Sequence, residues 1–174
     1  MEELELTYLV KELPDLKSVP SKEMLDIYLP STQEHCHLRI RKIGEKLEIT
    51  KKEPVTGTDS SHQLEITIPL TSAEYAELST LPGKRVGKTR YYYTEAGVDH
   101  EIDIFTGDLH GLVLVDVEFD TKENKSAFAK PSWCLAEVTQ EKFLAGGMLA
   151  GRKYEDIESR LETFGYKKLN ARHL

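Results

Sequence analysis

The chain has 174 residues, of which 30% are charged and 39% are hydrophobic, and this length fits one domain with a sizeable core. Its formal net charge of -7 argues against general DNA binding, because a basic surface dominates affinity for nucleic acid, although local basic clusters could bind a small polyphosphate. No run approaches the roughly 20 apolar residues of a membrane span, and the N-terminus lacks the basic and apolar regions of a signal peptide.

We therefore expect a single cytoplasmic domain spanning residues 1–174, without a membrane partner, present as a monomer or a homodimer. Cys36 and Cys134 lie far apart in the sequence. Two distant thiols without a secretory signal are more often reduced than paired, so we expect no structural disulfide.

Five segments in the first 70 residues alternate polar and apolar side chains, as β-strands with two different faces do. They are residues 3–11, 24–29, 37–43, 46–53 and 62–69. Gly44 and Glu45 predict a tight hairpin turn between the third and fourth segments. The two prolines within residues 13–23 predict a loop or a short helical excursion there.

The polar faces of these strands carry most of the charge. They hold Glu3, Glu5 and Thr7 in the first strand, Asp26 and Tyr28 in the second, Arg39 and Arg41 in the third, Glu48, Thr50 and Lys52 in the fourth, and Gln63, Glu65 and Thr67 in the fifth.

A helix and a sixth strand follow. Thr71 and Glu74 have the spacing of a capping box, which predicts a helix that ends before Pro82. Residues 84–94 then predict a strand with Lys88 and Arg90 on one face.

Residues 100–120 predict two more strands joined by a glycine-containing turn. Glu101 and Asp103 share one face of the first strand, and Asp116 and Glu118 share one face of the second, because side chains alternate across a strand. Carboxylates held this close repel one another and raise each other's pKa unless a cation lies among them. The face therefore needs open solvent, a metal ion, or Lys and Arg from elsewhere.

Three helices are expected after the last strand, over residues 122–129, 140–150 and 154–164. Gly146 and Gly147 weaken the second of them, and Gly165 ends the third. The C-terminal helices thus begin at about residue 140.

Eight antiparallel strands can close into a barrel, which removes the exposed edges of a sheet. In an ordinary barrel the charges are a solvated surface without function, since strands with polar faces outward are the common case. Such a barrel could carry an apolar ligand, and it predicts that Ile102, Val115 and Val117 point to the barrel axis. In an inverted barrel the charged faces line the lumen instead.

The distribution of charge favours the inverted barrel. Carboxylates crowd the first, seventh and eighth strands, while cations lie on the third, fourth and sixth, whereas a soluble surface usually mixes both signs. The lumen would then have an acidic wall and a basic wall. Carboxylate oxygens suit hard cations such as Mg²⁺ or Mn²⁺, and Arg and Lys suit phosphate oxygens.

This ordered set of charges resembles the CYTH superfamily, the triphosphate tunnel metalloenzymes, over nearly the whole chain. The residues that carry the resemblance are Glu3-x-Glu5, Arg39-x-Arg41, Lys52, Lys88-x-Arg90, Glu101-x-Asp103 and Asp116-x-Glu118. The family includes inorganic triphosphatases, thiamine triphosphatases, class IV adenylate cyclases and RNA triphosphatases. The resemblance implies an α+β fold, mainly β with flanking helices, built on an eight-stranded antiparallel closed barrel whose charged lumen binds a triphosphate and a divalent metal.

The resemblance also implies a role for each lumen residue. The implied metal ligands are Glu3, Glu5, Asp103, Asp116 and Glu118, and the implied substrate-binding residues are Arg39, Arg41, Lys52, Lys88 and Arg90. Glu5, Glu118 and Lys88 would serve in catalysis, with Glu65 and Glu101 as further acidic lumen positions. The expected function is a Mg²⁺- or Mn²⁺-dependent phosphohydrolase that cleaves the terminal phosphate of inorganic triphosphate or a small organic triphosphate.

Three positions depart from the family pattern. Thr7 replaces the Lys of the signature Glu-x-Glu-x-Lys, Gln63 replaces a common Glu, and residues 143–146 read Phe-Leu-Ala-Gly where many members have Arg-Tyr-Lys-Asn. The metal-binding set thus matches the family better than the substrate-binding set. The alternative hypothesis is a non-catalytic or weakly active CYTH protein that binds polyphosphate or nucleotide.

Overall fold

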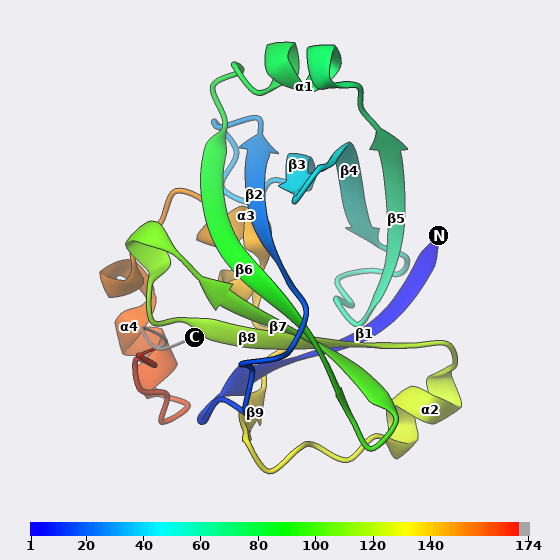
Figure 1. Ribbon diagram of the computed structural model, residues 1–174, viewed down its shortest axis with the longest axis vertical. Coiled ribbons are helices and arrows are strands. Elements are labelled where there is room, and N and C mark those ends of the chain that lie inside the picture. Colours follow the sequence, from blue (N-terminus) through cyan, green and yellow to red (C-terminus); the bar gives the residue numbers. More distant parts are fainter. Residues whose placement is uncertain (171–174) are drawn as a thin grey trace.

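The computed structural model describes residues 1–170 and consists of a closed antiparallel barrel with short helices around it. Neighbouring strands follow the order β5-β4-β3-β2-β6-β7-β8-β1, and β5 also pairs with β1, which closes the barrel (Figure 1). The strands are β1 (Glu2–Val10), β2 (Ser21–Leu29), β3 (Leu38–Ile43), β4 (Lys46–Pro54), β5 (His62–Pro69), β6 (Lys84–Glu95), β7 (Val98–Phe105) and β8 (Val113–Phe119). The predicted eight-stranded barrel is confirmed. The last residues of the predicted domain, 171–174, lie outside the described part.

The apolar faces of β1, β7 and β8 point out of the barrel and pack beneath loops. Ile102, Val115 and Val117 are fully buried there, in a cluster with Leu16 and Trp133. Their carboxylate neighbours on the same strands face the lumen, since side chains alternate. The ordinary barrel with an apolar interior is therefore wrong, and the inverted barrel is the observed arrangement.

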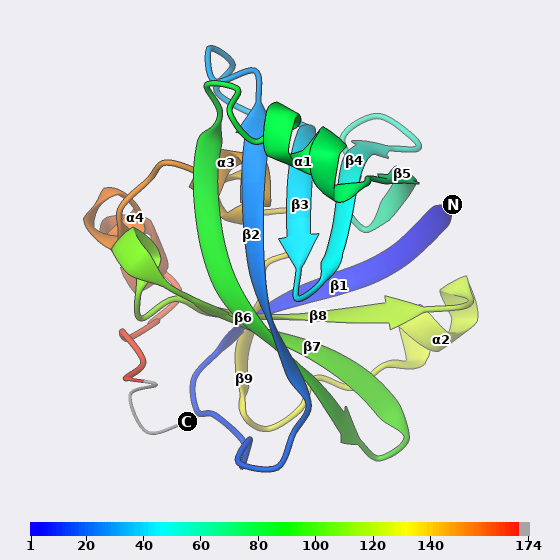
Figure 2. The same cartoon turned by 45° about the horizontal axis from the view of Figure 1, so that its top comes forward.

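A second hydrophobic cluster joins the barrel to the C-terminal helices. Phe143, Leu149 and Leu161 pack there with Phe105 and Leu114 of the barrel. Leu149 belongs to α3 (Gly146–Leu149) and Leu161 to α4 (Tyr154–Glu162). Burial of this apolar surface holds the helices against one side of the barrel, as Figures 1 and 2 show.

Side chains cap the N-termini of two helices, and the first of these caps was predicted. Thr71 and Glu74 form a full capping box at α1 (Ser72–Leu78), and the Thr121 hydroxyl accepts a hydrogen bond at the start of α2 (Lys122–Ala127). α2 ends earlier than expected because Phe128 is extended and contacts Phe119 and Tyr8.

The segment after α2 differs most from the sequence prediction. A ninth strand, β9 (Cys134–Glu137), pairs with β1 and was not predicted. The helix expected over residues 140–150 is instead a 3₁₀ turn, η2 (Lys142–Leu144), and the four-residue α3, separated by an extended Ala145. A second 3₁₀ turn, η1 (Gly107–Leu109), forms the glycine-containing turn between β7 and β8.

Two smaller findings complete the fold. Cys36 and Cys134 are free and buried, as expected for unpaired thiols. Among the described residues, no helix has both the length and the apolar character needed to cross a membrane.

Candidate functional site in the barrel lumen

The lumen holds a cavity of about 350 Å³ whose walls are charged. All ten residues predicted to bind metal or substrate line it, and so do Thr7, Gln63, Glu65 and Glu101. The predicted alternation of the strands therefore brings the charged residues of seven strands together in one cavity.

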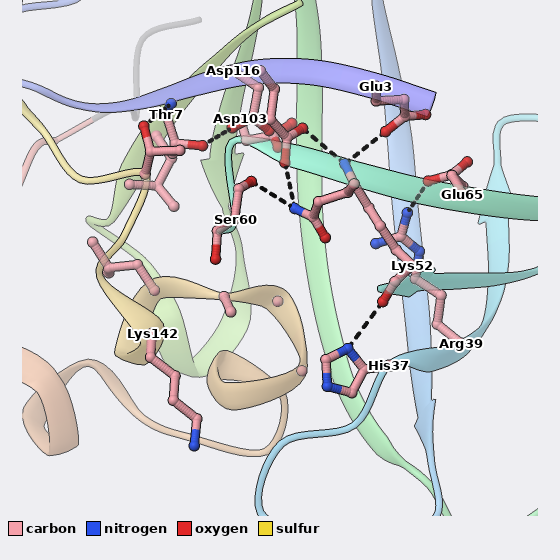
Figure 3. A pocket seen from close by; sticks show the side chains of 18 of the residues that line it. Glu3, Thr7, His37, Arg39, Lys52, Ser60, Glu65, Asp103, Asp116 and Lys142 are labelled. Carbon is pink, nitrogen blue, oxygen red and sulfur yellow. Dashed lines mark hydrogen bonds and ion pairs between the residues drawn. The ribbon is translucent and has the colours of Figure 1, made fainter. Parts of the chain in front are cut away.

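Three glutamates gather where β1 runs beside β8. Glu5 pairs directly with Glu118 across the two strands, and Glu3 precedes Glu5 on the same face. One carboxylate oxygen of each lies within 4.8 Å of the others. We call Glu3, Glu5 and Glu118 the glutamate cluster. Lys52 of β4 reaches it, with its ammonium 2.8 Å from an oxygen of Glu3 and 2.8 Å from one of Glu5 (Figure 3).

Neutral groups hold the remaining oxygen of Glu5. The Gln63 amide donates to it at 2.8 Å and also donates to the Ser60 carbonyl at 2.9 Å (Figure 3). Gln63 therefore orients the carboxylate without adding charge.

The environment of the glutamate cluster disfavours three negative charges. Burial raises the pKa of Glu118 to about 7, and the neighbouring Glu101 and Glu3 add to the shift. Burial also raises the pKa of Glu5, with Asp116 and Glu3 adding to the shift and Lys52 opposing it. The glutamate cluster thus has more negative charge than its surroundings stabilise.

A second charged group lies on β6, β7 and β8. Arg90 donates to both oxygens of Asp103 at 2.7 and 2.6 Å, to Asp116 at 3.2 Å, and to Glu101. Lys88 also pairs with Asp103, which is 2% exposed. We call Lys88, Arg90, Glu101, Asp103 and Asp116 the arginine network. Burial alone would raise the pKa of Asp103, but Arg90 and Lys88 lower it below its usual value.

Two more arginines come from β3. Arg41 makes a bidentate pair with the buried Asp26 of β2, at 2.6 and 2.7 Å. Arg39 donates to Glu65 at 3.3 Å and to the Tyr28 hydroxyl at 3.2 Å (Figure 3). Although burial opposes it, the Arg41 guanidinium lowers the pKa of Asp26 to about 2. Asp26 therefore stays ionised and fixes Arg41 in the cavity wall.

The segment around α3 forms another part of the wall. Gly146 and Gly147 approach the barrel so closely that a side chain there would collide with the Tyr28 hydroxyl and the Cys36 carbonyl. Lys142 also lines the cavity, but its side chain is exposed (Figure 3). The stretch that departs from the family pattern thus packs against the barrel through small residues.

Thr7 has partners of its own. Its hydroxyl donates to Asp116 at 2.7 Å, and its backbone N–H donates to the Thr139 hydroxyl at 3.0 Å. The position therefore contributes a hydrogen bond to the acidic wall in place of a positive charge.

The structure separates the predicted metal ligands into two groups. Glu3, Glu5 and Glu118 lie together, whereas Asp103 and Asp116 contact Arg90 of the arginine network. Within residues 1–170, one group of three or more His, Cys, Asp or Glu side chains is close enough to share one ion. Glu3, Glu5 and Glu118 form this group. Their hard oxygen donors fit Mg²⁺ or Mn²⁺.

Some site residues were not assigned roles from the sequence. Asp26 and Tyr28 position Arg41 and Arg39, and Ser60 helps to orient Gln63. For Asp26 and Tyr28 a signal was present, since both share the polar face of a predicted strand. Ser60 lies in a loop and carries no such periodic signal.

Two inorganic triphosphatases are similar to this chain in sequence. The one from Nitrosomonas europaea is 37% identical over 145 residues, which cover 82% of this chain and 92% of that protein. The one from Acetivibrio thermocellus is 27% identical over 121 residues, which cover 70% and 76% of the two chains. No protein-family model matches the sequence.

Solved structures show the same barrel. A crystal structure of an inorganic triphosphatase has a TM-score of 0.63 and 29% identity to this chain, and covers 86% of this chain and 95% of the other. A conserved hypothetical protein of Pyrococcus furiosus has a TM-score of 0.52 at 20% identity, over 95% and 92% of the two chains, and thus shares the fold. The barrel, its charged lumen and the sequence similarity to inorganic triphosphatases place this chain in the CYTH superfamily of triphosphate tunnel enzymes.

Proposed function

We propose that this protein hydrolyses inorganic triphosphate to diphosphate and phosphate inside the barrel, with Mg²⁺ or Mn²⁺ as its cofactor. The proposal rests on one observation: a single cavity holds both the glutamate cluster, with its excess negative charge, and four cationic side chains besides Lys52 that form ion pairs with acidic residues. Those side chains are Arg39, Arg41, Lys88 and Arg90. The similarity to two inorganic triphosphatases supports this choice of substrate.

Glu3, Glu5 and Glu118 would hold the divalent cation. Their oxygens are close together and come from neighbouring strands, which are rigid supports for a metal site. When bound, such a cation polarises phosphoryl oxygens and supplies charge stabilisation in the transition state. Asp116, which accepts a hydrogen bond from Thr7, lies beside this group as a further acidic neighbour.

The basic residues would bind the triphosphate chain. Arg41 and Arg90 are fixed by bidentate contacts to Asp26 and Asp103, so each guanidinium is oriented before substrate arrives. Preorganised donors of this kind stabilise developing charge without reorganisation during the reaction. Water would attack the terminal phosphorus in line, and the bond to the leaving diphosphate would break while Lys88 and Arg90 stabilise its charge.

A product assay tests this function. Purified protein is incubated with inorganic triphosphate and Mg²⁺ or Mn²⁺, and phosphate and diphosphate are measured separately. We expect one of each per triphosphate consumed, loss of activity with EDTA, and loss of most activity in Glu118→Ala.

Calorimetry separates the competing outcomes. Tight triphosphate binding without turnover would show that the protein binds triphosphate but does not hydrolyse it. If the protein neither binds nor hydrolyses triphosphate, both the enzymatic and the binding function are overturned. Diphosphate released from an organic triphosphate without phosphate would indicate cyclase-type chemistry instead.

A further inference from the structure

The ammonium of Lys52 contacts the same carboxylates that would bind the metal ion. Its ammonium lies 2.8 Å from Glu3 and 2.8 Å from Glu5, between two members of the glutamate cluster. The ammonium therefore neutralises part of the charge that a divalent cation would neutralise. A cation held by the same oxygens would repel it at short range.

The other cavity cations with short contacts are held by different acidic groups. Arg41 pairs with Asp26, Arg39 pairs with Glu65, and both residues of β6 pair with Asp103. Among the described residues, Lys52 is the one cation in an ion pair with the glutamate cluster. Displacing it would leave the other ion pairs of the cavity unchanged.

A second position, beside Arg39, is within reach of the Lys52 side chain. Its backbone N–H donates to the carbonyl of His37, which directly precedes β3, so Lys52 lies diagonally across from Arg39, the second residue of β3. Long side chains at diagonal positions can reach one another's ligands. Figure 3 shows the Arg39 guanidinium on the same side of the cavity as Lys52. A lysine stem is flexible and its ammonium is a point charge, so it can turn from the glutamates toward a phosphate held by Arg39.

We propose that Lys52 exchanges partners: a divalent cation displaces it from Glu3 and Glu5, and it then binds a phosphate group of the substrate. This inference rests on the proposed function. The exchange makes metal and triphosphate binding cooperative, because each ligand favours the same position of Lys52. Thermodynamic linkage requires that the effect be reciprocal.

Lys52→Met tests the exchange through two binding measurements without turnover. The first is Mn²⁺ binding to the protein alone, followed through the electron paramagnetic resonance signal of free Mn²⁺. The second is calorimetric binding of a methylene-bridged triphosphate analogue, which cannot be hydrolysed, in EDTA. We expect Lys52→Met to bind Mn²⁺ about tenfold more tightly, since a like charge is removed at short range, and to bind the analogue about tenfold more weakly.

Lys51→Met is the matched control. Lys51 precedes Lys52 on β4, is exposed, and pairs with Glu53 at 3.0 Å on the outside of the barrel. The Lys51→Met substitution removes the same charge from the same strand as Lys52→Met. Because that charge is exposed and screened by solvent, the affinities for Mn²⁺ and the analogue should stay within about twofold of wild type.

Each outcome has a definite meaning. Opposite shifts in the two affinities of Lys52→Met support the exchange. A change in Mn²⁺ affinity alone would make Lys52 a fixed partner of the glutamates, and a change in analogue affinity alone would make it a fixed phosphate ligand. Either result overturns the exchange and leaves the proposed function standing. Failure of the wild-type protein to bind Mn²⁺ or the analogue would overturn the proposed function itself.

Discussion

The two acidic groups of the lumen differ in how well their charge is balanced. In the glutamate cluster, Lys52 is the one cation for three carboxylates among the described residues, and its ammonium contacts Glu3 and Glu5. In the arginine network, both oxygens of Asp103 are occupied by Arg90, and Lys88 adds a second cation. With Lys52 included, the first group has three carboxylates for one cation, whereas the second has three carboxylates for two cations, so negative charge is less well balanced in the first.

From this difference we distinguish a group suited to binding a metal ion from a group suited to positioning cationic side chains. Excess carboxylate charge raises the pKa of the acids and favours an added cation. A buried, paired carboxylate instead fixes its cationic partners, and removing it leaves them unpaired at high cost. We therefore propose that the glutamate cluster binds the metal ion and that Asp103 orients the cations that would bind phosphate.

The largest effect is expected for Glu5→Gln. Replacing one oxygen ligand by a neutral amide should lower the rate of phosphate release by a factor of about 100 or more. The free energy of unfolding should stay equal or rise, because repulsion within the glutamate cluster is relieved.

Phosphate release and urea unfolding measure these two quantities. Glu53→Gln, on the exposed side of the same barrel, is the control and should change neither. A Glu5→Gln protein with wild-type turnover would remove the glutamate cluster from the mechanism.

Asp103→Asn should act mainly on stability. The substitution leaves Arg90 and Lys88 buried without their shared carboxylate, and we expect the free energy of unfolding to fall by about 3 kcal/mol. Mn²⁺ affinity measured at a temperature where the variant is folded should remain close to wild type. If stability holds while Mn²⁺ affinity collapses, Asp103 is a metal ligand and the comparison above is wrong.

The metal affinity should depend on pH through Glu118. Its folded-state pKa is raised to about 7, so below that pH a proton must leave before the carboxylate can bind a cation. Mn²⁺ affinity should rise by up to about tenfold per pH unit below 7 and level off above it.

The same shift has a consequence for stability without metal. Because the folded-state pKa exceeds the unfolded value, the stabilisation from the protonated acid is present below the unfolded pKa. It is lost as the pH rises through about 7. Glu118→Gln should flatten both pH profiles, and unchanged profiles would show that another group titrates.

The smallest effect is expected for Thr7→Val. It removes the hydrogen bond to Asp116 but keeps the shape of the side chain, so KM for triphosphate should rise by no more than about threefold, and stability should fall by about 1 kcal/mol. A loss of activity as large as that of Glu5→Gln would place Thr7 and Asp116 inside the metal site.

The barrel could be predicted because its strands obey a strict alternation. Glu101 and Asp103 on one face and Ile102 on the other reveal two different environments, and the opposite signs on different strands indicate that the charged face is the inner one. Alternation does not identify which carboxylate meets which cation. Bidentate pairing of Arg90 with Asp103 depends on strand register and side-chain reach, which periodicity does not contain.

The segment after α2 could not be predicted for a different reason. β9 is short and forms by pairing with the C-terminal end of β1, a contact far away in the sequence. The expected helix over residues 140–150 is broken at the extended Ala145, directly before Gly146 and Gly147, which pack against Tyr28 and Cys36. Tertiary packing, rather than local propensity, decides the structure of both stretches.

The most direct test of the account is the position of a bound metal ion. Crystals grown with Mn²⁺ and the methylene-bridged triphosphate analogue would be measured at the manganese absorption edge. We predict an anomalous peak within bonding distance of oxygens from Glu3, Glu5 and Glu118, with the ammonium of Lys52 displaced toward the analogue. A peak held instead by Asp103 and Asp116, with Lys52 still between Glu3 and Glu5, would contradict the account.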